Sequence, residues 1–251
     1  GLLRRKYGKI NKKQRRNTMS KIGIIGAMEE EVTALRNKMS NKELKQIAGM
    51  DFYQGILEDQ EVVLVRCGIG KVNAAICTQA LIDTFHIQYI INTGVAGGIY
   101  EKLDIGDIVI SSDGVQHDFD TTAFGDPIGI IPRMDESFFK ADDQLIQLAK
   151  ESAKNLPSNP KVYVGRIASG DQFISGSKQK ERIWNHFQAY CAEMEGAAIA
   201  HTCYLNQIPF VIIRSISDKA DHSADINFQE FVVEAAKNSN DMLIEILKRI
   251  S

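Results

Sequence analysis

The run Val211-Ile212-Ile213-Arg214-Ser215-Ile216-Ser217-Asp218 constrains the fold more than any other stretch of the chain. An apolar run of this length is typical of a buried strand in an α/β sheet. It contains two charged residues, Arg214 and Asp218, and a buried charge without a partner is costly. On a straight strand the two share a face but stand roughly 13 Å apart, at ~3.3 Å per residue. Either they have structural roles, as an ion pair across a bent strand or an N-cap, or they serve a ligand at the strand end.

Composition excludes several classes of protein. The 251 residues are 44% hydrophobic and 25% charged, which is typical of a globular protein. No apolar run approaches the ~20 residues of a membrane span. The four cysteines lack CxxC spacing, and the five histidines form no metal-ligand pattern. The sequence therefore predicts a cytoplasmic protein without a metal or a cofactor.

The first eighteen residues differ from the rest, because they hold eight Lys or Arg and no acid. The whole chain has a formal charge of −2, so the remaining residues carry −10. A basic segment of this kind can bind nucleic acid or anionic lipid, but it lacks the apolar core of a signal peptide. Since Met19 precedes a clear strand, we expect residues 1–18 to be an upstream or artificially added extension and residues 19–251 to be the folded domain. The acidic body argues against a role in binding nucleic acid.

Strand and helix patterns alternate along the chain. We expect strands near residues 22–27, 43–48, 52–57, 62–66, 89–92, 108–111, 162–167 and 210–217, and helices near 28–39, 71–85, 142–154, 178–186, 194–204 and 228–250. The segment 113–133 lacks regular structure, and loops of that length are usually functional or mobile. No linker or repeat interrupts the alternation, which indicates a single α/β domain with a mixed sheet.

The stretch Gly23-Ile24-Ile25-Gly26-Ala27-Met28-Glu29-Glu30-Glu31 is a glycine-rich connection from strand to helix, without the GxGxxG spacing of a dinucleotide site. Acids in a first helical turn are favoured by the helix dipole, which accounts for two of the glutamates. The third could point into a cleft, so a structural and a catalytic role both remain open for it.

The stretch Thr93-Gly94-Val95-Ala96-Gly97-Gly98 predicts a tight turn, which either only reverses the chain or lets a ligand approach backbone N–H groups. No lysine follows as in a P-loop.

Glu193 and Glu195 are two residues apart, so on a helix they do not share a face. We expect one to be solvated or to act as a first-turn acid. The other must accept hydrogen bonds from backbone N–H groups or from the hydroxyls of a sugar.

Five motifs occur in a compatible order and spacing: GIIGAMEEE, TGxAGG, SGDxFI, EMEG and RSISD. Together they resemble the 5′-methylthioadenosine/S-adenosylhomocysteine nucleosidases of the nucleoside phosphorylase superfamily, from about Met19 to the C-terminus. The resemblance implies a single-domain, three-layer α/β/α fold with a mixed central sheet, nucleoside phosphorylase-like. It also implies small purine thionucleosides as ligands and no metal or cofactor.

The resemblance also implies residue roles. Glu31 matches the base that activates the attacking water, and Asp218 matches the acid that protonates adenine at N7. Seven further positions match groups that bind the substrate: Glu195 and Met194 at the ribose, Phe173 and the backbone of Ile174 at adenine, Gly97 in the glycine-rich turn, Arg214 on the water and ribose side, and Ser217 supporting Asp218.

The implied reaction is hydrolysis of the N-glycosidic bond of 5′-methylthioadenosine and S-adenosylhomocysteine, giving adenine and the 5-thioribose product in methionine salvage. Positive charge develops on the ribose, while adenine leaves well only when it is protonated. Glu31 takes a proton from water and Asp218 supplies one to adenine. Full protonation of an ordinary aspartate at pH 7 needs a pKa shift of ~3 units. We therefore expect a proton to be shared between Asp218 and N7 as the bond breaks, so Asp218 need not be protonated at rest.

Two other functions stay open, phosphorolysis and non-catalytic purine nucleoside binding. Many relatives carry a hydroxyl residue at the position of Val95, and related phosphorylases use such a hydroxyl to hold phosphate, so Val95 favours hydrolysis. The resemblance further implies a homodimer in which the partner closes the 5′ end of the pocket. The loop 113–133, with Phe124 and Ile131 as exposed apolar residues, is the candidate for this contact, and Phe228 is a candidate for the apolar wall.

Overall fold

The computed structural model describes residues 21–250, so the basic segment 1–18 lies outside the described residues. The described strands form one mixed ten-stranded sheet in the order β10-β6-β8-β9-β5-β1-β4-β3-β2, with β7 paired to β6. The strands are β1 (Ile22–Gly26), β2 (Ser40–Ile47), β3 (Met50–Leu57), β4 (Gln60–Arg66), β5 (Tyr89–Gly98), β6 (Ile108–Gln116), β7 (Phe138–Lys140), β8 (Val162–Ser169), β9 (Cys191–Glu193) and β10 (Phe210–Asp218).

The pairing of the strands brings several carboxyl ends to one edge of the sheet. Strands β4, β1, β5 and β10 are parallel neighbours. On the other side, β10 pairs with β6, β6 with β8, β8 with β9, and β9 returns to β5, so these five strands close into a ring. The short β9 therefore brings residue 192 opposite Gly97 in β5. This edge is where open α/β sheets place their ligand sites.

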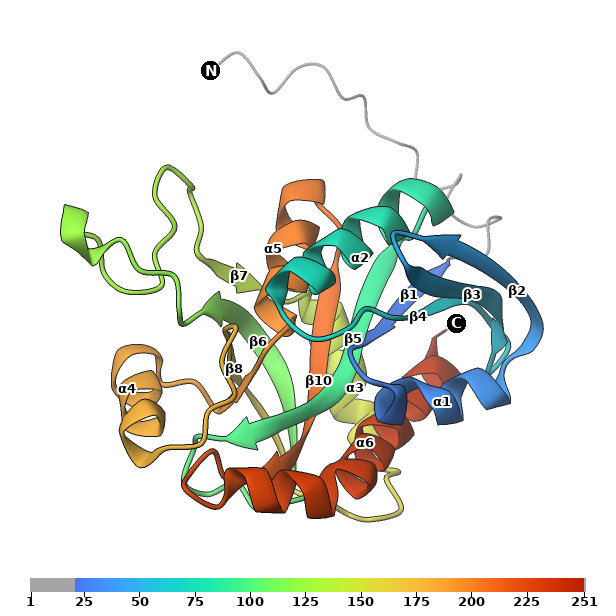
Figure 1. Ribbon diagram of the computed structural model, residues 1–251. Helices are drawn as coiled ribbons and strands as arrows, with labels where there is room; N and C mark the ends of the chain where they lie inside the picture. The colour runs from blue at the N-terminus through green and yellow to red at the C-terminus, as the bar shows by residue number, and fades with distance from the viewer. Residues whose placement is uncertain (1–20, 251) are drawn as a thin grey trace.

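Two groups of helices cover the two faces of the sheet (Figure 1). Helices α1 (Glu29–Lys38), α3 (Asp143–Ala153) and α6 (Ala224–Arg249) pack on one face, and α2 (Lys71–Phe85) and α5 (Gly196–Asn206) pack on the other. Neighbouring strand residues point to opposite faces. Thus Ile24 and Ile213 belong to the core under α1, α3 and α6, whereas Ile25 and Ile212 belong to the core under α2 and α5. The predicted fold class, α/β with a mixed central sheet, is confirmed.

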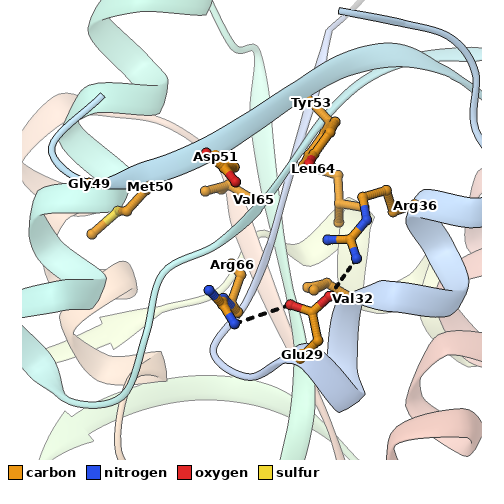
Figure 2. A pocket seen from close by; sticks show the side chains of 10 residues that line it. All are labelled: Glu29, Val32, Arg36, Gly49, Met50, Asp51, Tyr53, Leu64, Val65 and Arg66. Atoms are coloured by element: carbon orange, nitrogen blue, oxygen red, sulfur yellow. Dashed lines mark hydrogen bonds and ion pairs between the residues drawn. The ribbon is translucent and has the colours of Figure 1, made fainter. Parts of the chain in front are cut away.

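Helix α1 begins directly after β1 and carries the three acids of the sequence motif. Glu29 forms ion pairs with Arg36 of the same helix and, at 3.2 Å, with Arg66 at the end of β4 (Figure 2). These contacts lower the pKa of Glu29, first through the hydrogen bond from Arg36. Glu30 is exposed. The first two acids are therefore structural or solvated, and only Glu31 turns inward.

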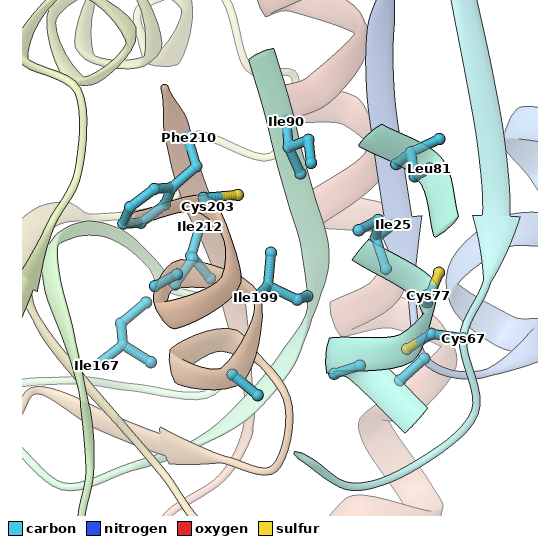
Figure 3. Close-up of a cluster of buried hydrophobic side chains, with 14 of the residues drawn as sticks. Ile25, Cys67, Cys77, Leu81, Ile90, Ile167, Ile199, Cys203, Phe210 and Ile212 are labelled. Atoms are coloured by element: carbon cyan, nitrogen blue, oxygen red, sulfur yellow. The ribbon is translucent and has the colours of Figure 1, made fainter. Parts of the chain in front are cut away.

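The core under α2 and α5 explains the small residues of α5. Gly196, Ala197, Ala198 and Ala200 are buried, which lets this helix lie close to the sheet. Ile199 and Cys203 of α5 belong to one buried cluster with Ile212 of β10 and Cys77 of α2 (Figure 3). All four cysteines are buried free thiols. Among residues 21–250, no helix has the length and apolar character needed to cross a membrane.

Two sequence predictions of local structure are wrong. The stretch 93–98 is not a turn, because β5 continues to Gly98 with β10 and β9 as partners. The expected helix 194–204 begins later, at Gly196, because Glu193 ends β9 and Glu195 occupies the N-cap position of α5. The three-residue strands β7 and β9 were not predicted, since each is too short to show an alternating pattern and forms only by pairing with distant strands.

The segment 113–133 is partly regular. Strand β6 runs to Gln116, and a single 3₁₀ turn, η2 (Thr122–Phe124), lies in the part of the loop that extends from the body in Figure 1. Phe124 is 88% exposed, as expected. Ile131 is buried in the core, so its prediction as an exposed residue is wrong. Its N–H donates to Ser137, which ties it to the body of the protein. Helix α4 (Ser177–Phe187) follows β8.

Candidate active site

A cavity of about 370 Å³ lies where β1, β5, β9 and β10 end. This volume is in the range of small-molecule sites. Its lining includes eight of the nine candidate residues from the sequence together with Glu193, Phe228 and several small or apolar side chains. The candidates that line it are Glu31, Gly97, Phe173, Met194, Glu195, Arg214, Ser217 and Asp218.

Glu31 reaches the cavity from the first turn of α1 and is 1% exposed. Its Oε1 accepts hydrogen bonds from the N–H groups of Ala27 and Met28, both at 2.9 Å. Its Oε2 accepts from the N–H of Val95 in β5, also at 2.9 Å. Burial raises the pKa of Glu31, while Arg214 and these backbone donors oppose the rise. Three N–H groups thus favour the carboxylate form of Glu31 at this buried position.

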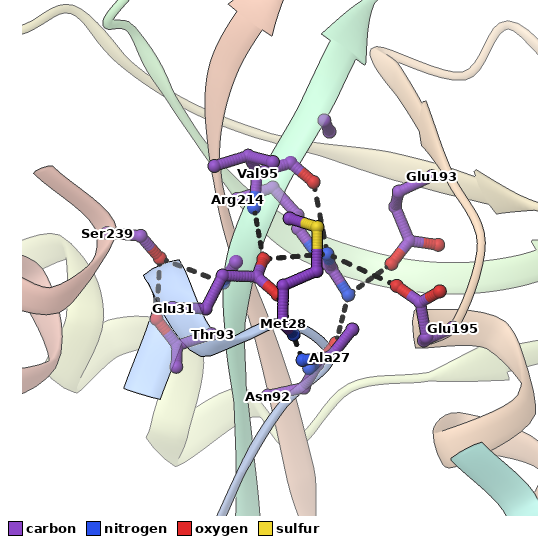
Figure 4. A network of polar contacts seen from close by, with 12 residues as sticks. Ala27, Met28, Glu31, Asn92, Thr93, Val95, Glu193, Glu195, Arg214 and Ser239 are labelled. Carbon is purple, nitrogen blue, oxygen red and sulfur yellow. Dashed lines mark hydrogen bonds and ion pairs between the residues drawn. The ribbon is translucent and has the colours of Figure 1, made fainter. Parts of the chain in front are cut away.

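Arg214 is the centre of the charged side of the cavity (Figure 4). Its Nη1 donates to the carbonyl oxygen of Val95 at 3.0 Å, and its Nη2 donates to Oδ1 of Asn92 at 2.6 Å. It also forms an ion pair with Glu193 and lies within 4 Å of Glu31 and Glu195. It does not pair with Asp218, because the two charges of β10 serve different parts of the cavity.

Glu193 and Glu195 are both buried and neither lies in the first turn of α5, so the prediction that one is solvated or acts as a first-turn acid is wrong. That prediction assumed a helix, whereas the end of β9 and the N-cap of α5 turn both carboxylates toward Arg214. Oε2 of Glu195 accepts a hydrogen bond from the N–H of Gly70 at 2.9 Å. Burial raises the pKa of Glu195. The pair with Arg214 opposes that rise, and the nearby Glu193 carboxylate adds to it.

Asp218 ends β10 and is 1% exposed. Its Oδ1 accepts from the N–H of Ala220 at 2.8 Å, and its Oδ2 accepts from the hydroxyl of Ser217 at 2.9 Å. Burial raises the pKa of Asp218, and these two hydrogen bonds only partly oppose it. The register of β10 against β5 shifts between Ile216 and Asp218, which marks the point where the strand turns the acid into the cavity.

Two glycines of β5 make room for the charged side chains. A Cβ at Gly94 would lie 2.1 Å from Oε2 of Glu31 and 2.6 Å from Nη1 of Arg214. A Cβ at Gly97 would lie 2.9 Å from Oδ1 of Asp218. The glycines of this stretch are therefore needed for close approach of side chains to the strand, and not for a turn.

Aromatic and apolar side chains form the rest of the cavity wall. Phe173 is 43% exposed and meets Phe228 of α6 edge to face, with ring centroids 5.6 Å apart. Such a pair offers a flat apolar surface to a ligand ring. Met194 and Val95 also line the cavity, and Val95 packs with Phe228 in an apolar cluster. Ile174 is buried among core residues and does not line the cavity, so its backbone role stays a prediction.

The residues that sequence reasoning did not assign are Glu193, Asn92, Ser169 and the lining residues Met28 and Ile69. The EMEG motif was the only sequence signal for Glu193. The helix predicted at this point gave the wrong direction for its side chain. Asn92 looked like the end of a short strand. Within residues 21–250, no group of three or more His, Cys, Asp or Glu side chains is arranged to hold a metal ion.

Comparison with known proteins places this cavity in a family. Residues 21–248 match the family model described as Phosphorylase superfamily. The 5′-methylthioadenosine/S-adenosylhomocysteine nucleosidase of Staphylococcus carnosus is 47% identical over 230 residues, which cover 91% of this chain and 100% of that protein. This chain belongs to the same nucleosidase family, within the phosphorylase superfamily.

Solved structures agree with this placement in the nucleosidase family. The Neisseria meningitidis nucleosidase, crystallised with methylthio-immucillin-A, is 42% identical with a TM-score of 0.89, covering 92% of this chain and 100% of that chain. The Colwellia psychrerythraea nucleosidase, crystallised with adenine, is 42% identical with a TM-score of 0.88, covering 92% and 95% of the two chains. The family resemblance predicted from the five motifs is therefore confirmed.

Proposed function

We propose that this chain hydrolyses the N-glycosidic bond of 5′-methylthioadenosine and S-adenosylhomocysteine, releasing adenine and the 5-thioribose product. One observation carries the proposal: two buried acids with different surroundings, Glu31 and Asp218, line one cavity of suitable size. The curated and solved relatives named above carry this activity in their names.

Glu31 is the base of the proposed reaction. As the glycosidic bond lengthens and the ribose gains positive charge, the Glu31 carboxylate takes a proton from the attacking water. Its three backbone N–H donors keep it an acceptor until that moment. Glu195 accepts hydrogen bonds from the ribose hydroxyls, and Met194 packs beneath the sugar.

Asp218 is the acid. Its buried position raises its pKa, which favours a proton shared with N7 of adenine as that nitrogen becomes more basic. Ser217 and the N–H of Ala220 fix the orientation of the carboxyl group. Phe173 stacks on the adenine ring, and Gly97 leaves room for Asp218 beside β5. Protonated adenine then leaves as a neutral molecule.

Water, and not phosphate, is the proposed nucleophile. The side chain of Val95 has no hydroxyl to bind phosphate. Arg214 is the only arginine of residues 21–250 that lines the cavity, and it is surrounded by Glu31, Glu193 and Glu195. A phosphate dianion beside three carboxylates would meet strong repulsion, whereas a neutral water molecule would not.

The test is adenine release from both substrates in phosphate-free buffer, followed by absorbance and by chromatography of the sugar product. We expect full turnover without phosphate and a free thioribose product. Turnover that requires phosphate and yields a ribose 1-phosphate product would establish a phosphorylase. Tight binding with no adenine formed over hours would establish a binding protein.

A homodimer is part of the proposal. The exposed Phe124 lies on a loop that extends from the body (Figure 1), which supports its insertion beside the 5′ end of a partner's cavity. Analytical ultracentrifugation of the wild type and of Phe124→Ala tests this. We expect a dimer for the wild type, and for the variant a weaker dimer with a raised KM. A fully active wild-type monomer would reject the dimer.

We also propose a cytoplasmic location and a place in methionine salvage. The four unpaired, buried thiols support a reducing compartment. The boundaries of the domain at residues 19–251, after the basic segment 1–18, stay a prediction.

A further inference from the structure

The carboxylate of Glu193 makes buried contacts that have no role in the reaction described above. Both oxygens of its carboxylate accept from the N–H of Gly196, at 2.8 and 3.1 Å, and one also accepts from the hydroxyl of Ser169. The hydroxyl of Ser169 in turn accepts from the N–H of Ala197 at 2.7 Å. These donors hold the Glu193 side chain in one orientation at the start of α5.

The two terminal nitrogens of the Arg214 guanidinium have different neighbours. Both hydrogens of Nη2 have acceptors, Glu193 and Oδ1 of Asn92. Nη1 gives one hydrogen to the carbonyl of Val95. The second hydrogen of Nη1 lies between Glu195 at 3.8 Å and Glu31 at 3.9 Å, both beyond hydrogen-bond distance.

We propose that Glu193 is a positioning residue for hydrolysis: by holding Nη2 of Arg214 it directs Nη1 into the gap between Glu31 and Glu195, where the attacking water and the ribose meet. A guanidinium is planar, so fixing one nitrogen fixes the direction of the other. The inference deepens the proposed function and rests on it, because the gap has a role only if water attacks there.

The carbonyl of Val95 holds Nη1, and Asn92 makes a single hydrogen bond to Nη2, so both of these contacts are to neutral acceptors. Glu193 adds a second, charged contact anchored by backbone N–H groups of α5. The pair is buried on both sides, and breaking it by removing one partner leaves an uncompensated charge.

The experiment measures adenine release by Glu193→Gln in phosphate-free buffer. Glutamine keeps the shape of the side chain but replaces one acceptor oxygen with an NH₂ group, which repels Nη2. We expect kcat to fall about 10- to 100-fold, the cost of a small misplacement near the reacting atoms, while KM changes by a smaller factor. Glu234→Gln, the same change at an exposed position of α6, serves as the matched control and keeps wild-type kinetics.

A double-mutant cycle separates positioning from a general structural role. If Glu193 acts through Arg214, adding Glu193→Gln to Arg214→Gln lowers kcat by less than about twofold further. Multiplicative losses in the double variant, or wild-type kcat in Glu193→Gln, would overturn the inference. Should Glu193→Gln not fold, as judged by its melting curve, Glu193→Asp keeps the charge but is too short to hold both Ser169 and Arg214. It must then lose kcat, and wild-type kcat in this variant also overturns the inference.

The failure of the inference and of the proposed function are distinct outcomes. Hydrolysis by the wild type with full activity in Glu193→Gln removes only the positioning role. No adenine release by the wild type removes the function itself.

Discussion

The two acids of the cavity are equally buried but differently surrounded. Glu31 accepts three backbone N–H bonds and lies beside Arg214. Asp218 accepts one N–H bond and one hydroxyl bond, and within residues 21–250 no Lys, Arg or His nitrogen lies within ion-pair distance of it. Burial raises the pKa of both, but only Glu31 has an arginine and a full set of donors to oppose the rise.

The difference shows how one cavity can hold a base and an acid of similar chemistry. Donors and a cation stabilise the charged form of Glu31, so it is suited to accept a proton. Fewer donors stabilise the charged form of Asp218, so it is suited to hold or share one. Environment, more than residue type, assigns the two roles.

The largest expected effect comes from removing either acid. Glu31→Gln and Asp218→Asn should each lower kcat/KM about 10²- to 10⁴-fold, the usual contribution of a general acid or base. Initial rates of adenine release, with circular dichroism to confirm folding, measure this. Glu30→Gln is the matched control, because Glu30 occupies the same helical turn but is exposed.

The pH profiles of the same variants separate the two roles. Activity should fall as pH drops through the pKa of Glu31, because the base must be ionised, and this limb disappears in Glu31→Gln. Activity should fall as pH rises, because the proton that Asp218 shares with N7 is then lost to solvent, and this limb disappears in Asp218→Asn. Burial moves both limbs above the ordinary pKa values of about 4.3 and 3.9. Variants that lose the opposite limbs would reverse the assignment.

Alanine at the two glycines of β5 should disturb the two acids one at a time. Gly94→Ala places a methyl group 2.1 Å from Glu31 and 2.6 Å from Arg214, so a displacement near 1 Å and a loss of about 10²-fold in kcat are expected. Gly97→Ala meets Asp218 at 2.9 Å and should cost less.

Gly98→Ala is the control for both glycine variants. Its nearest neighbour is a side-chain methyl of Ile216 at 3.3 Å, which can move slightly. Kinetics of the three variants should therefore rank in the order of these distances. An equal loss in Gly98→Ala would mean that β5 tolerates no side chain for reasons unrelated to the acids.

Much of this arrangement could be predicted from local sequence. The continuous apolar runs of β1 and β10 indicated buried strands, and the charges inside the run of β10 pointed to Arg214 and Asp218 as unusual. From the residues alone, Glu31 was not separable from its two neighbours. The order of the five motifs was needed for that.

The parts that could not be predicted depend on contacts between distant residues. Gly94 and Gly97 resemble turn glycines in sequence, but they are needed because charged side chains approach the strand there. Glu31, which approaches Gly94, is 63 residues away from it, and Asp218, which approaches Gly97, is 121 residues away. Glu193 depends on β9, a three-residue strand that exists only through its pairing with β5 and β8. No local pattern contains this information.

The smallest effect concerns stability on the Glu31 side, where three carboxylates share one guanidinium. Burial raises the pKa of Glu195 in the folded protein, opposed by Arg214 and increased by Glu193 and Glu31. A carboxyl group with a raised pKa favours the folded state at low pH, and that contribution is lost as pH rises from its ordinary value of about 4.3 through the raised value. Glu195→Gln removes this loss, so its stability relative to the wild type should increase with pH.

Melting curves without ligand between pH 5 and 9 measure the effect. The difference in unfolding free energy between Glu195→Gln and the wild type should grow by on the order of 1 kcal/mol over this range. Glu234→Gln, exposed on α6, should show a difference that does not change with pH. If the Glu195→Gln difference is also flat, Arg214 compensates all three carboxylates. The Glu31 side would then carry no excess of negative charge, and the contrast with Asp218 would depend on the backbone N–H groups alone.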